Sequence, residues 1–335
     1  MNGNKPLLTV CVIGRNEARN LTALSDSLKP LGDLPFQTET LFVDSASTDD
    51  SDAVAQRLFN KVFVLEASPR LCASAARNIG TIRASGKWIL YLDGDMTLDR
   101  RFVDKLASLT KLDPGHHGLV GVITDSFPDG SSRQVRLDID KTGVVRHFGG
   151  PVVLPREMVI RAGNWNPSVD SNEEIDLYTR LRPLGAIVFG FQVAMVTHRT
   201  ERIPAWRLAV GNLIPGVQLG KKCYGFGQIL VSRVLNGGVW NFIRWYPIPF
   251  VCWVTMMVAV ATAAGFSARA AAVVIALGWG AATGIAGLNR MVMFNLQIAH
   301  VILGVWHYDS KYVPRIRVEF DSAAAAGGSN PSCAE

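Results

Sequence analysis

The chain has 335 residues, which is long for one typical compact core, so we expect a main domain and a further part. Its net charge of +6 is modest and no nucleic-acid-binding motif accompanies the basic residues, so no nucleic-acid partner is expected. The five cysteines lie far apart with no Cys-x-x-Cys pair. This spacing argues against a disulfide framework or a thiolate metal site and favours a reducing compartment.

The beginning of the chain shows no sign of a signal peptide. Residues 1–5 are polar, and the apolar run 7–13 is too short for a membrane anchor and lacks a cleavage-type end. We therefore expect residues 1–200 to lie in the cytoplasm.

The first hundred or so positions alternate between strand-like and helix-like patterns. Four apolar runs predict strands, at residues 7–14, 38–45, 61–67 and 87–93, and the segments between them have helical spacing or helix-capping residues. This order predicts an α/β domain whose mostly parallel sheet is covered by helices on both faces. Ligands of such sheets bind at the carboxyl ends of the strands, which places residues 14–17, 44–49 and 93–95 at one edge.

The pattern loosens after residue 109. Residues 115–127 and 133–140 are typical of strands in a mixed or antiparallel part, and Gly149-Gly150 forms a loop before a short strand and helix. A helix is predicted within residues 171–185, with three acids near its start, and a strand within 187–198. The small, polar residues 322–335 are typical of disorder.

Acidic side chains recur at the predicted strand ends. Asp93 and Asp95 stand one residue apart after a buried strand, where they repel each other and cost energy to desolvate. Each acidic cluster also has a structural explanation when taken singly, because Asp-Gly is a common turn and helix N-termini favour acids. Their order and spacing together favour a functional site.

Five motifs in one order carry a resemblance to a known family. They lie at residues 13–18 (IGRNEA), 43–49 (VDSASTD), 76–80 (ARNIG), 92–95 (LDGD) and 173–180 (EEIDLYTR). Over residues 7–200 the chain resembles the inverting family 2 glycosyltransferases of GT-A fold. Two positions depart from the family pattern: Ile13 replaces a proline, and Glu174 stands where an aspartate is usual.

The resemblance implies a binding site for a nucleotide sugar, UDP- or GDP-linked. Asp44 would reach the base, Glu17 the ribose, and Arg77 the base or the diphosphate. Asp93 would lie near the ribose or a metal-bound water, and the glycine loop would border the sugar. The implied nucleotide-sugar-binding residues are Glu17, Asp44, Arg77, Asp93, Gly149 and Gly150.

The resemblance also implies a divalent cation, Mg²⁺ or Mn²⁺, bound by Asp95 with Asp93 and His198 beside it. Hard oxygen ligands suit these ions, which also bind substrate phosphates. A divalent cation neutralises the charge that develops on a leaving diphosphate. The positive charge of the cation would thus compensate the negative charges of Asp93 and Asp95. For His198, a hydrogen-bonded histidine without metal is the alternative.

Glu174 is the implied general base, taking a proton from an acceptor hydroxyl in a direct displacement that inverts the anomeric carbon. A positioned carboxylate contributes roughly 10²–10⁴-fold to such a step. Trp165 and Glu173 are expected on the acceptor side.

The second half of the chain predicts membrane attachment. The only charged residue between Arg244 and Arg290 is Arg269, and residues 247–266 and 270–288 are each long enough to cross a bilayer as a helix. Residues 291–306 would span, re-enter or lie in the interface. Basic residues and tryptophans precede these runs, as at a cytoplasmic membrane surface. We therefore predict four parts: a catalytic domain (1–200), an interface segment (201–246), two or three membrane helices (247–306) and a cytoplasmic or disordered tail (307–335).

These features predict a multi-pass protein of the inner membrane with its catalytic domain in the cytoplasm. The expected reaction transfers a sugar to a polyprenyl-diphosphate-linked saccharide, as in exopolysaccharide assembly of the succinoglycan type. One alternative uses polyprenyl phosphate itself as acceptor, and another is a catalytically silent scaffold of the same fold. A nucleotidyltransferase is disfavoured because the N-terminal region lacks a Gly-rich activation loop. The segment around Gln218 resembles a processive-synthase motif only vaguely, so we expect transfer of one or a few sugars.

Overall fold

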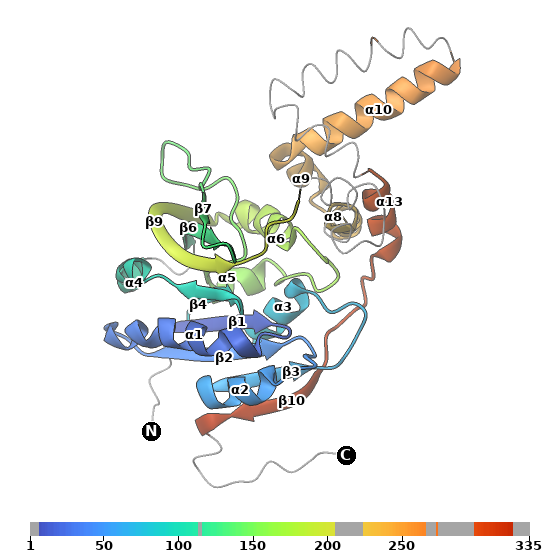
Figure 1. The fold of residues 1–335 in the computed structure, drawn as a ribbon. Helices are drawn as coiled ribbons and strands as arrows, with labels where there is room; N and C mark the ends of the chain where they lie inside the picture. The colour runs from blue at the N-terminus through green and yellow to red at the C-terminus, as the bar shows by residue number, and fades with distance from the viewer. Residues whose placement is uncertain (1–6, 113–115, 205–223, 266–272, 274–297, 324–335) are drawn as a thin grey trace. The chain divides into compact units, whose positions relative to one another are not determined.

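The computed structural model describes residues 7–112, 116–204, 224–265, 273 and 298–323 (Figure 1). The chain divides into two compact units. The first comprises Met1–Ser168, Glu173–Arg202 and Lys311–Glu335, and the second comprises Val169–Asn172 and Ile203–Ser310.

The first unit is built on a parallel core of four strands. These are β1 (Leu8–Gly14), β2 (Thr38–Asp44), β3 (Lys61–Leu65) and β4 (Trp88–Asp93), in the order β3-β2-β1-β4. Six of the seven residues of β1 are buried, and so are five of the six in β4. A strand buried on both faces requires cover on both sides of the sheet, which explains the continuous apolar runs in the sequence. The four strands confirm the predicted α/β core.

Helices and short turns connect these strands. The connections are α1 (Ala18–Leu28) with η1 (Lys29–Asp33), α2 (Ser51–Leu58) and α3 (Ala73–Arg83). In α1 the leucines at 21, 24 and 28 are buried, and this spacing of three and four residues is the one that puts side chains on a single helix face. Gly80 of α3 packs on β1, because a Cβ there would lie 2.1 Å from the Cys11 sulfur.

The sheet continues beyond β4 with mostly antiparallel pairing. β8 (Val152–Pro155) pairs with β4, followed by β6 (His117–Ser126), β9 (Ile187–Arg199) and β5 (Met96–Leu98), while β7 (Ser132–Val135) pairs with β6. Only β6 and β9 are parallel in this part. The described residues therefore form one mixed sheet of 10 strands. The prediction of a mostly parallel sheet was correct only for the first four strands.

Five short helical segments accompany the mixed part of the sheet. They are α4 (Arg100–Leu106), η2 (Ala107–Lys111), α5 (Arg156–Arg161), α6 (Glu173–Leu181) and η3 (Arg182–Leu184). An i,i+4 ion pair between Asp176 and Arg180 stabilises α6 at 2.6 Å. Arg180 also donates hydrogen bonds to the carbonyl oxygens of Ala162 and Asn164. These two motif residues thus fix the helix whose first turn carries Glu174.

The C-terminal part of the chain supplies an edge strand that the sequence analysis missed. β10 (Ile316–Asp321) pairs antiparallel with β3 at the end of the sheet. Residues 307–335 were predicted to be a tail apart from the domain, and for residues 316–321 this was wrong. The segment IRVEFD alternates apolar and polar residues, which was the available strand signal. Arg83 and Glu319 form an exposed ion pair at 3.2 Å across this edge.

The second unit is helical in its described residues. Its helices are α8 (Tyr224–Asn236), α9 (Val239–Trp245), α10 (Pro247–Gly265) and α13 (Ile298–His307). Glycines bring α8 and α13 together, because a Cβ on Gly227 would lie 2.0 Å from the Val301 carbonyl oxygen and one on Gly304 would lie 2.2 Å from that of Tyr224. The close approach of these two helices therefore depends on residues without side chains.

Among the helices that the structure describes, none has both the length and the apolar character needed to cross a membrane. The first predicted span coincides with α10, and the third overlaps α13 in its second half. The second predicted span, residues 270–288, lies outside the described residues apart from residue 273. In the predicted interface segment, residues 205–223 also lie outside them.

Candidate active site

The loops that follow β1 and β2 interlock through the side chains of two predicted motifs. The backbone N–H of Asn16 donates to Ser47 Oγ at 2.8 Å, and the N–H of Thr48 donates back to Asn16 Oδ1 at 2.8 Å. Asp49 accepts from the N–H of Ala18 at 3.2 Å, at the first residue of α1. The two motifs therefore fold as one structure, with these side chains replacing backbone hydrogen bonds that neither loop can make alone.

Left-handed backbone occurs next to several of the predicted site residues. The described residues other than glycine with positive φ are Asn16, Ala46, Asn164 and Asn172. Asn16 precedes Glu17, Ala46 follows the strand that ends in Asp44, and Asn172 precedes α6 with Glu174. Such conformations cost energy and are found preferentially where a site requires a particular geometry. Their positions independently mark these loops as a functional region.

The tripeptide Asp93-Gly94-Asp95 at the end of β4 lies against the loop after β1. The N–H of Gly94 donates to the Ile13 carbonyl oxygen at 2.8 Å. A Cβ at position 94 would lie 2.7 Å from Glu17 Cγ, so glycine is needed for Glu17 to pack here. The first half of the predicted site, Glu17 with the two aspartates, is thus brought together as expected.

Asp93 makes an ion pair with a buried arginine. Arg77 Nη2 is 2.7 Å from Asp93 Oδ1, and Arg77 Nη1 is 2.6 Å from Glu173 Oε1. The Arg77 side chain is 2% exposed. Both ends of the guanidinium are used internally in this structure, and contact with the nucleotide stays a prediction. Arg77 instead compensates two acids from distant motifs and holds them together. We call Arg77, Asp93 and Glu173 the arginine cluster.

Gly150 and Trp165 enclose the arginine cluster. A Cβ on Gly150 would lie 2.7 Å from Arg77 Nη2 and 3.0 Å from Asp93 Oδ2, so the glycine loop runs directly over the pair. At Gly149 a Cβ would lie 3.3 Å from Ile123 Cδ1. Trp165 is 0% exposed, with the Arg77 guanidinium 5.2 Å from its ring centroid. The expectation that Trp165 and Glu173 face an acceptor was wrong, because one is core and the other is paired with Arg77.

Glu174 follows Glu173 in the first turn of α6 and is partly exposed. Poor solvation, together with repulsion from Glu173, raises the pKa of Glu174 to about 8. The Arg77 guanidinium opposes this rise in pKa, and Asp93 adds to it, so Glu174 lies within the electrostatic reach of the arginine cluster. A carboxylate with a pKa near neutrality is suited to accept a proton from a weakly acidic hydroxyl.

Asp44 and Glu17 occupy different environments at the same edge. Asp44 is buried and accepts a hydrogen bond from the N–H of Ser47 at 2.8 Å. Burial raises the pKa of Asp44 despite this bond. Burial also raises the pKa of Glu17, and the charge of Asp95 adds to the effect, while Asn20 donates to its Oε2 at 2.6 Å. Glu17 is therefore the more accessible of the two acids.

Asp95 lies on the other side of the tripeptide and contacts His198 at the end of β9. The distance from His198 Nε2 to Asp95 Oδ2 is 3.3 Å, and Nδ1 lies 3.0 Å from Asp125 Oδ1. The hydrogen bond to Asp95, followed by that to Asp125, raises the pKa of His198 to about 9. We call Asp95, His198 and Asp125 the histidine cluster. Asp93 does not belong to it, so the structure brings together only two of the three predicted metal residues.

The histidine cluster fits a divalent cation in its donor chemistry. Within the described residues no three His, Cys, Asp or Glu side chains form a ready-made metal site. Asp95 Oδ1, however, is buried and has no hydrogen-bond partner in the structure. An unsatisfied carboxylate oxygen in that setting costs free energy unless a ligand or ion compensates it. Oxygen donors with few protein ligands suit an ion that also binds substrate phosphates.

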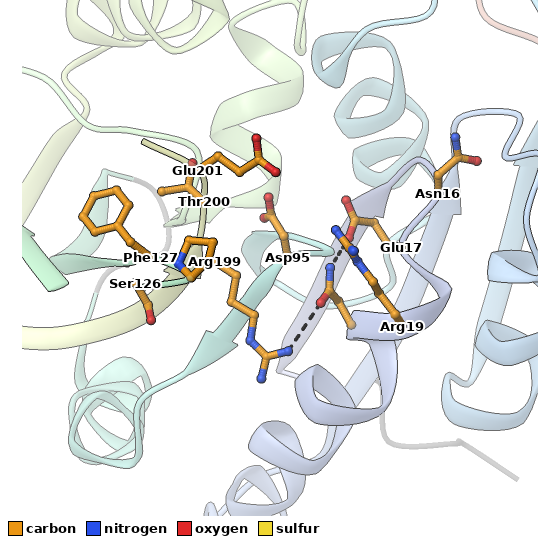
Figure 2. Close-up of a pocket in the computed structure, with 11 residues that line it drawn as sticks. Asn16, Glu17, Arg19, Asp95, Ser126, Phe127, Arg199, Thr200 and Glu201 are labelled. Atoms are coloured by element: carbon orange, nitrogen blue, oxygen red, sulfur yellow. Dashed lines mark hydrogen bonds between the residues drawn. The ribbon is translucent and has the colours of Figure 1, made fainter. Parts of the chain in front are cut away.

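A cavity of about 710 Å³ opens beside Asp95 (Figure 2). Figure 2 shows Asp95 between Glu17 on one side and Thr200 and Glu201 on the other. Its lining comprises Asn16, Glu17, Arg19, Asn20, Asp95, Ser126, Phe127, Pro128, Arg199, Thr200 and Glu201. Two of these are exposed arginines, so the cavity offers both acids for a cation and positive charge for an anion.

A second cavity, of about 320 Å³, lies at the carboxyl ends of the parallel strands. Its walls come from the segments after β1, β2 and β3: Arg15, Ala46, Ala67, Ser68, Pro69 and Leu71. Ala46 belongs to the same turn as Asp44, which ends β2. The sheet edge thus has room for a ligand both beside Glu17 and beside the turn after β2, as expected for strands whose connections diverge.

The family comparison covers Glu17, Asp44, Arg77, Asp93 and Asp95, while Glu174 and His198 lie beyond it. Residues 9–165 match the family model described as "Glycosyl transferase family 2". Nearly half of the chain is therefore similar to glycosyltransferase family 2. A curated relative from Rickettsia felis, named "Uncharacterized glycosyltransferase", is 30% identical over 99 residues, which cover 30% of this chain. The chain matches only about a third of that relative's length (32%).

Solved structures share the GT-A fold of the domain. The mannosyltransferase PcManGT from Pyrobaculum calidifontis, solved with GDP-Man and Mn²⁺, has a TM-score of 0.53 at 18% identity, covering 91% of this chain and 88% of its own. S. aureus TarS 1-349, solved with UDP-GlcNAc, has a TM-score of 0.50 at 15% identity, covering 89% of each chain. At these identities the likeness establishes the fold alone.

Several residues of the site were not predicted. Asp125 contacts His198, Arg133 contacts Asp125 at 2.7 Å, and Asn16 joins the two loops. The signal for Asp125 was its place in an otherwise apolar strand segment, where an unpaired acid is costly. For Arg133 the sequence offered no signal, since it follows from the register of β6 with β7.

Proposed function

We propose that the protein is a metal-dependent, inverting glycosyltransferase that transfers a sugar from a nucleotide sugar to a lipid-linked acceptor. One observation supports this most strongly: α3, β4 and the first turn of α6 meet through the arginine cluster, while the loops after β1 and β2 interlock with each other and β1 contacts the turn after β4. The arrangement provides Glu17 and Asp44 to bind a nucleoside and Asp95 to bind a cation. It also provides Glu174 to take a proton from the acceptor.

The donor proposed for this site is a UDP- or GDP-linked sugar. The cavity beside Ala46 has both polar lining residues, Arg15 and Ser68, and apolar ones, and Ala46 lies two positions after Asp44, which suits a nucleoside. The larger cavity beside Asp95 contains Arg19 and Arg199, which suit a diphosphate. PcManGT was solved with GDP-Man and TarS with UDP-GlcNAc, so proteins of this fold accept either nucleotide.

Mg²⁺ or Mn²⁺ is the proposed cofactor, held by Asp95 with His198 beside it. When bound, it would supply Lewis-acid stabilisation for the leaving diphosphate. PcManGT was solved with Mn²⁺. The partnerless Asp95 Oδ1 is the feature of this chain that favours such an ion. Asp93 is paired with Arg77, so it does not compete with Asp95 for the ion.

Glu174 is the proposed general base. Its pKa of about 8 makes it a stronger base than an ordinary carboxylate, and Arg77 nearby limits the rise. The base would deprotonate an acceptor hydroxyl opposite the leaving nucleotide, and a single displacement of this kind inverts the anomeric centre. Glu173 stays paired with Arg77 and fixes the first turn of α6.

The proposed acceptor is a polyprenyl-diphosphate-linked saccharide at the cytoplasmic face of the inner membrane, in assembly of an exopolysaccharide. The second unit supports contact with lipid: Trp240 is 78% exposed on α9 and Trp306 is 81% exposed on α13. Exposed Arg244 lies one turn after Trp240 on α9. Aromatic and basic side chains together favour the headgroup region of an anionic leaflet.

The test of the donor is a panel of nucleotide sugars measured with the full chain. We expect one UDP- or GDP-linked sugar to raise the melting temperature in the presence of Mn²⁺ and to be hydrolysed or transferred slowly. EDTA should abolish both effects. No response to any nucleotide sugar, with Mn²⁺ present and the protein folded, would refute the proposal.

The membrane part has a separate test. Sedimentation of the full chain with phosphatidylglycerol vesicles should exceed that with phosphatidylcholine vesicles. The double substitution Trp240→Ala and Trp306→Ala should weaken binding without changing the response to nucleotide sugar. Equal sedimentation of the variant and the wild type would exclude these tryptophans as the lipid contact.

A further inference from the structure

Neighbouring strands place a line of polar side chains across the mixed half of the sheet. In the strand register Arg133 of β7 faces Asp125 of β6, and Asp125 faces His198 of β9. His198 in turn faces Met96 of β5, the residue after Asp95. The line therefore ends at the acid proposed to bind the cation.

Asp125 is the central member of this line. It is buried, with 6% exposure, and both of its oxygens are used. Oδ1 lies 3.0 Å from His198 Nδ1, and Oδ2 lies 2.7 Å from Arg133 Nη2. Since a buried carboxylate is costly without partners, these contacts hold it in one orientation.

We infer that Asp125, oriented by Arg133, is a positioning residue that fixes the ring of His198 so that Nε2 faces Asp95. The inference rests on the proposed function, because it concerns the cation side of that site. The two ring nitrogens of histidine are distinct, and the partner of one decides what the other presents. A carboxylate at Nδ1 orients the ring and increases the basicity of Nε2.

A purely structural role explains these contacts less well. The backbone ladder of β6 and β9 continues on both sides of Asp125, through Thr124 with Thr197 and Ser126 with Arg199. Arg133 is 70% exposed, and an ion pair with such an exposed partner contributes little to stability. The line therefore does more for the orientation of one imidazole than for the stability of the sheet.

The principal test is the affinity of the full chain for Mn²⁺ in the presence of UDP or GDP, measured from the EPR signal of the free ion. Asp125→Ala should weaken Mn²⁺ binding about 10- to 100-fold, since loss of such an outer carboxylate has this effect at other metal sites. Asp125→Asn keeps an oxygen acceptor for Nδ1 and should retain most of the affinity. Arg133→Met should weaken binding less than Asp125→Ala.

Asp129→Ala is the matched control, because Asp129 lies in the same β6–β7 hairpin and contacts Arg202 at 3.5 Å instead of His198. Its Mn²⁺ affinity should equal that of the wild type. Should Asp125→Ala fail to fold by circular dichroism, Asp125→Thr, which suits a strand, removes the same carboxylate.

NMR of the imidazole provides a second readout. The Nδ1 proton of His198 should be protected from exchange in the wild type and in Asp125→Asn. In Asp125→Ala this protection, and with it the NMR signal of the proton, should be lost. A folded Asp125→Ala protein with unchanged Mn²⁺ affinity and an unchanged ring signal would overturn the inference. A wild type that binds no Mn²⁺ would instead refute the metal part of the proposed function, and the ring signal would still decide whether Asp125 positions His198.

Discussion

The two sides of Asp93-Gly94-Asp95 compensate negative charge in different ways. On one side Asp93 meets the Arg77 guanidinium at 2.7 Å, so the chain itself supplies the positive charge. On the other side Asp95 faces His198 at 3.3 Å and keeps one buried oxygen without a hydrogen bond. Two acids that look equivalent in the sequence are therefore different in the fold.

This difference separates charge compensation that is built into the fold from charge compensation by a ligand that can bind and leave. Arg77 is enclosed by Trp165 and the glycine loop, and its two ion pairs join α3, β4 and α6 without any ligand. The histidine cluster lies beside the cavity that contains Glu17 and the exposed arginines. We interpret the arginine cluster as the scaffold of the site and the histidine cluster as its ligand-binding part. The five predictions below test this division.

The largest effect is expected from Glu174→Gln. Loss of the base should lower kcat about 10²- to 10⁴-fold while leaving donor affinity close to that of the wild type. Turnover is measured with the donor identified in the nucleotide-sugar panel, and donor affinity by calorimetry. An equal loss of donor affinity would move Glu174 out of the role of base and into the binding site. Glu157→Gln, on α5, is the control.

Asp95→Asn should disable the histidine cluster, the ligand-binding part of the site. Activity should fall about 10²- to 10³-fold, as when a group that stabilises transition-state charge is lost. Unchanged activity, or unchanged Mn²⁺ affinity, would contradict the assignment.

Arg77→Met should disrupt the arginine cluster, the scaffold of the site. The substitution keeps bulk but leaves Asp93 and Glu173 without their shared counter-charge, and such losses in buried ion pairs cost about 3–5 kcal/mol. Urea unfolding measures the change in the free energy of unfolding. Adding Glu173→Gln should recover part of the loss, and the absence of any recovery would show that the two residues are not coupled in stability.

Gly150→Ala should have a smaller effect of the same kind. The added Cβ would lie 2.7 Å from Arg77 Nη2 and must displace the loop or the guanidinium. Overpacking of this type costs about 1–3 kcal/mol. Gly130→Ala meets no atom within 4 Å and tests the backbone strain of a positive-φ glycine without a clash. A loss at position 150 no greater than at position 130 would remove the packing argument.

The pH profile should show the most gradual effect. Since Glu174 acts as a base and its pKa is about 8, kcat/KM should fall about tenfold per pH unit below that value and level off above it. Because the folded-state pKa of Glu174 is raised above the ordinary value of 4.5, its contribution to stability is present below pH 4.5 and is lost as the pH rises through 8. Glu174→Gln should therefore gain stability relative to the wild type between pH 5 and pH 9. A constant difference would show that Glu174 has an ordinary pKa.

The sequence was sufficient for the parallel half of the fold and for much of the site. Continuous apolar runs identified β1 to β4, and acids after those runs identified Glu17, Asp44, Asp93 and Asp95, because local composition and strand ends are close in sequence. The mixed half was predicted less well. Pairings such as β6 with β9, and β10 with β3, join segments whose own patterns do not specify a partner.

The residue types at strand ends determined where charge would gather, since a strand buried on both faces can place polar side chains only at its ends. Which charge neutralises which was decided by the tertiary structure alone. Arg77 and Glu173 are 96 positions apart, and Asp125 and His198 are 73 apart. Side-chain pairing at a few ångströms depends on strand register and helix placement, and one residue of register shift turns a side chain to the opposite face of the sheet.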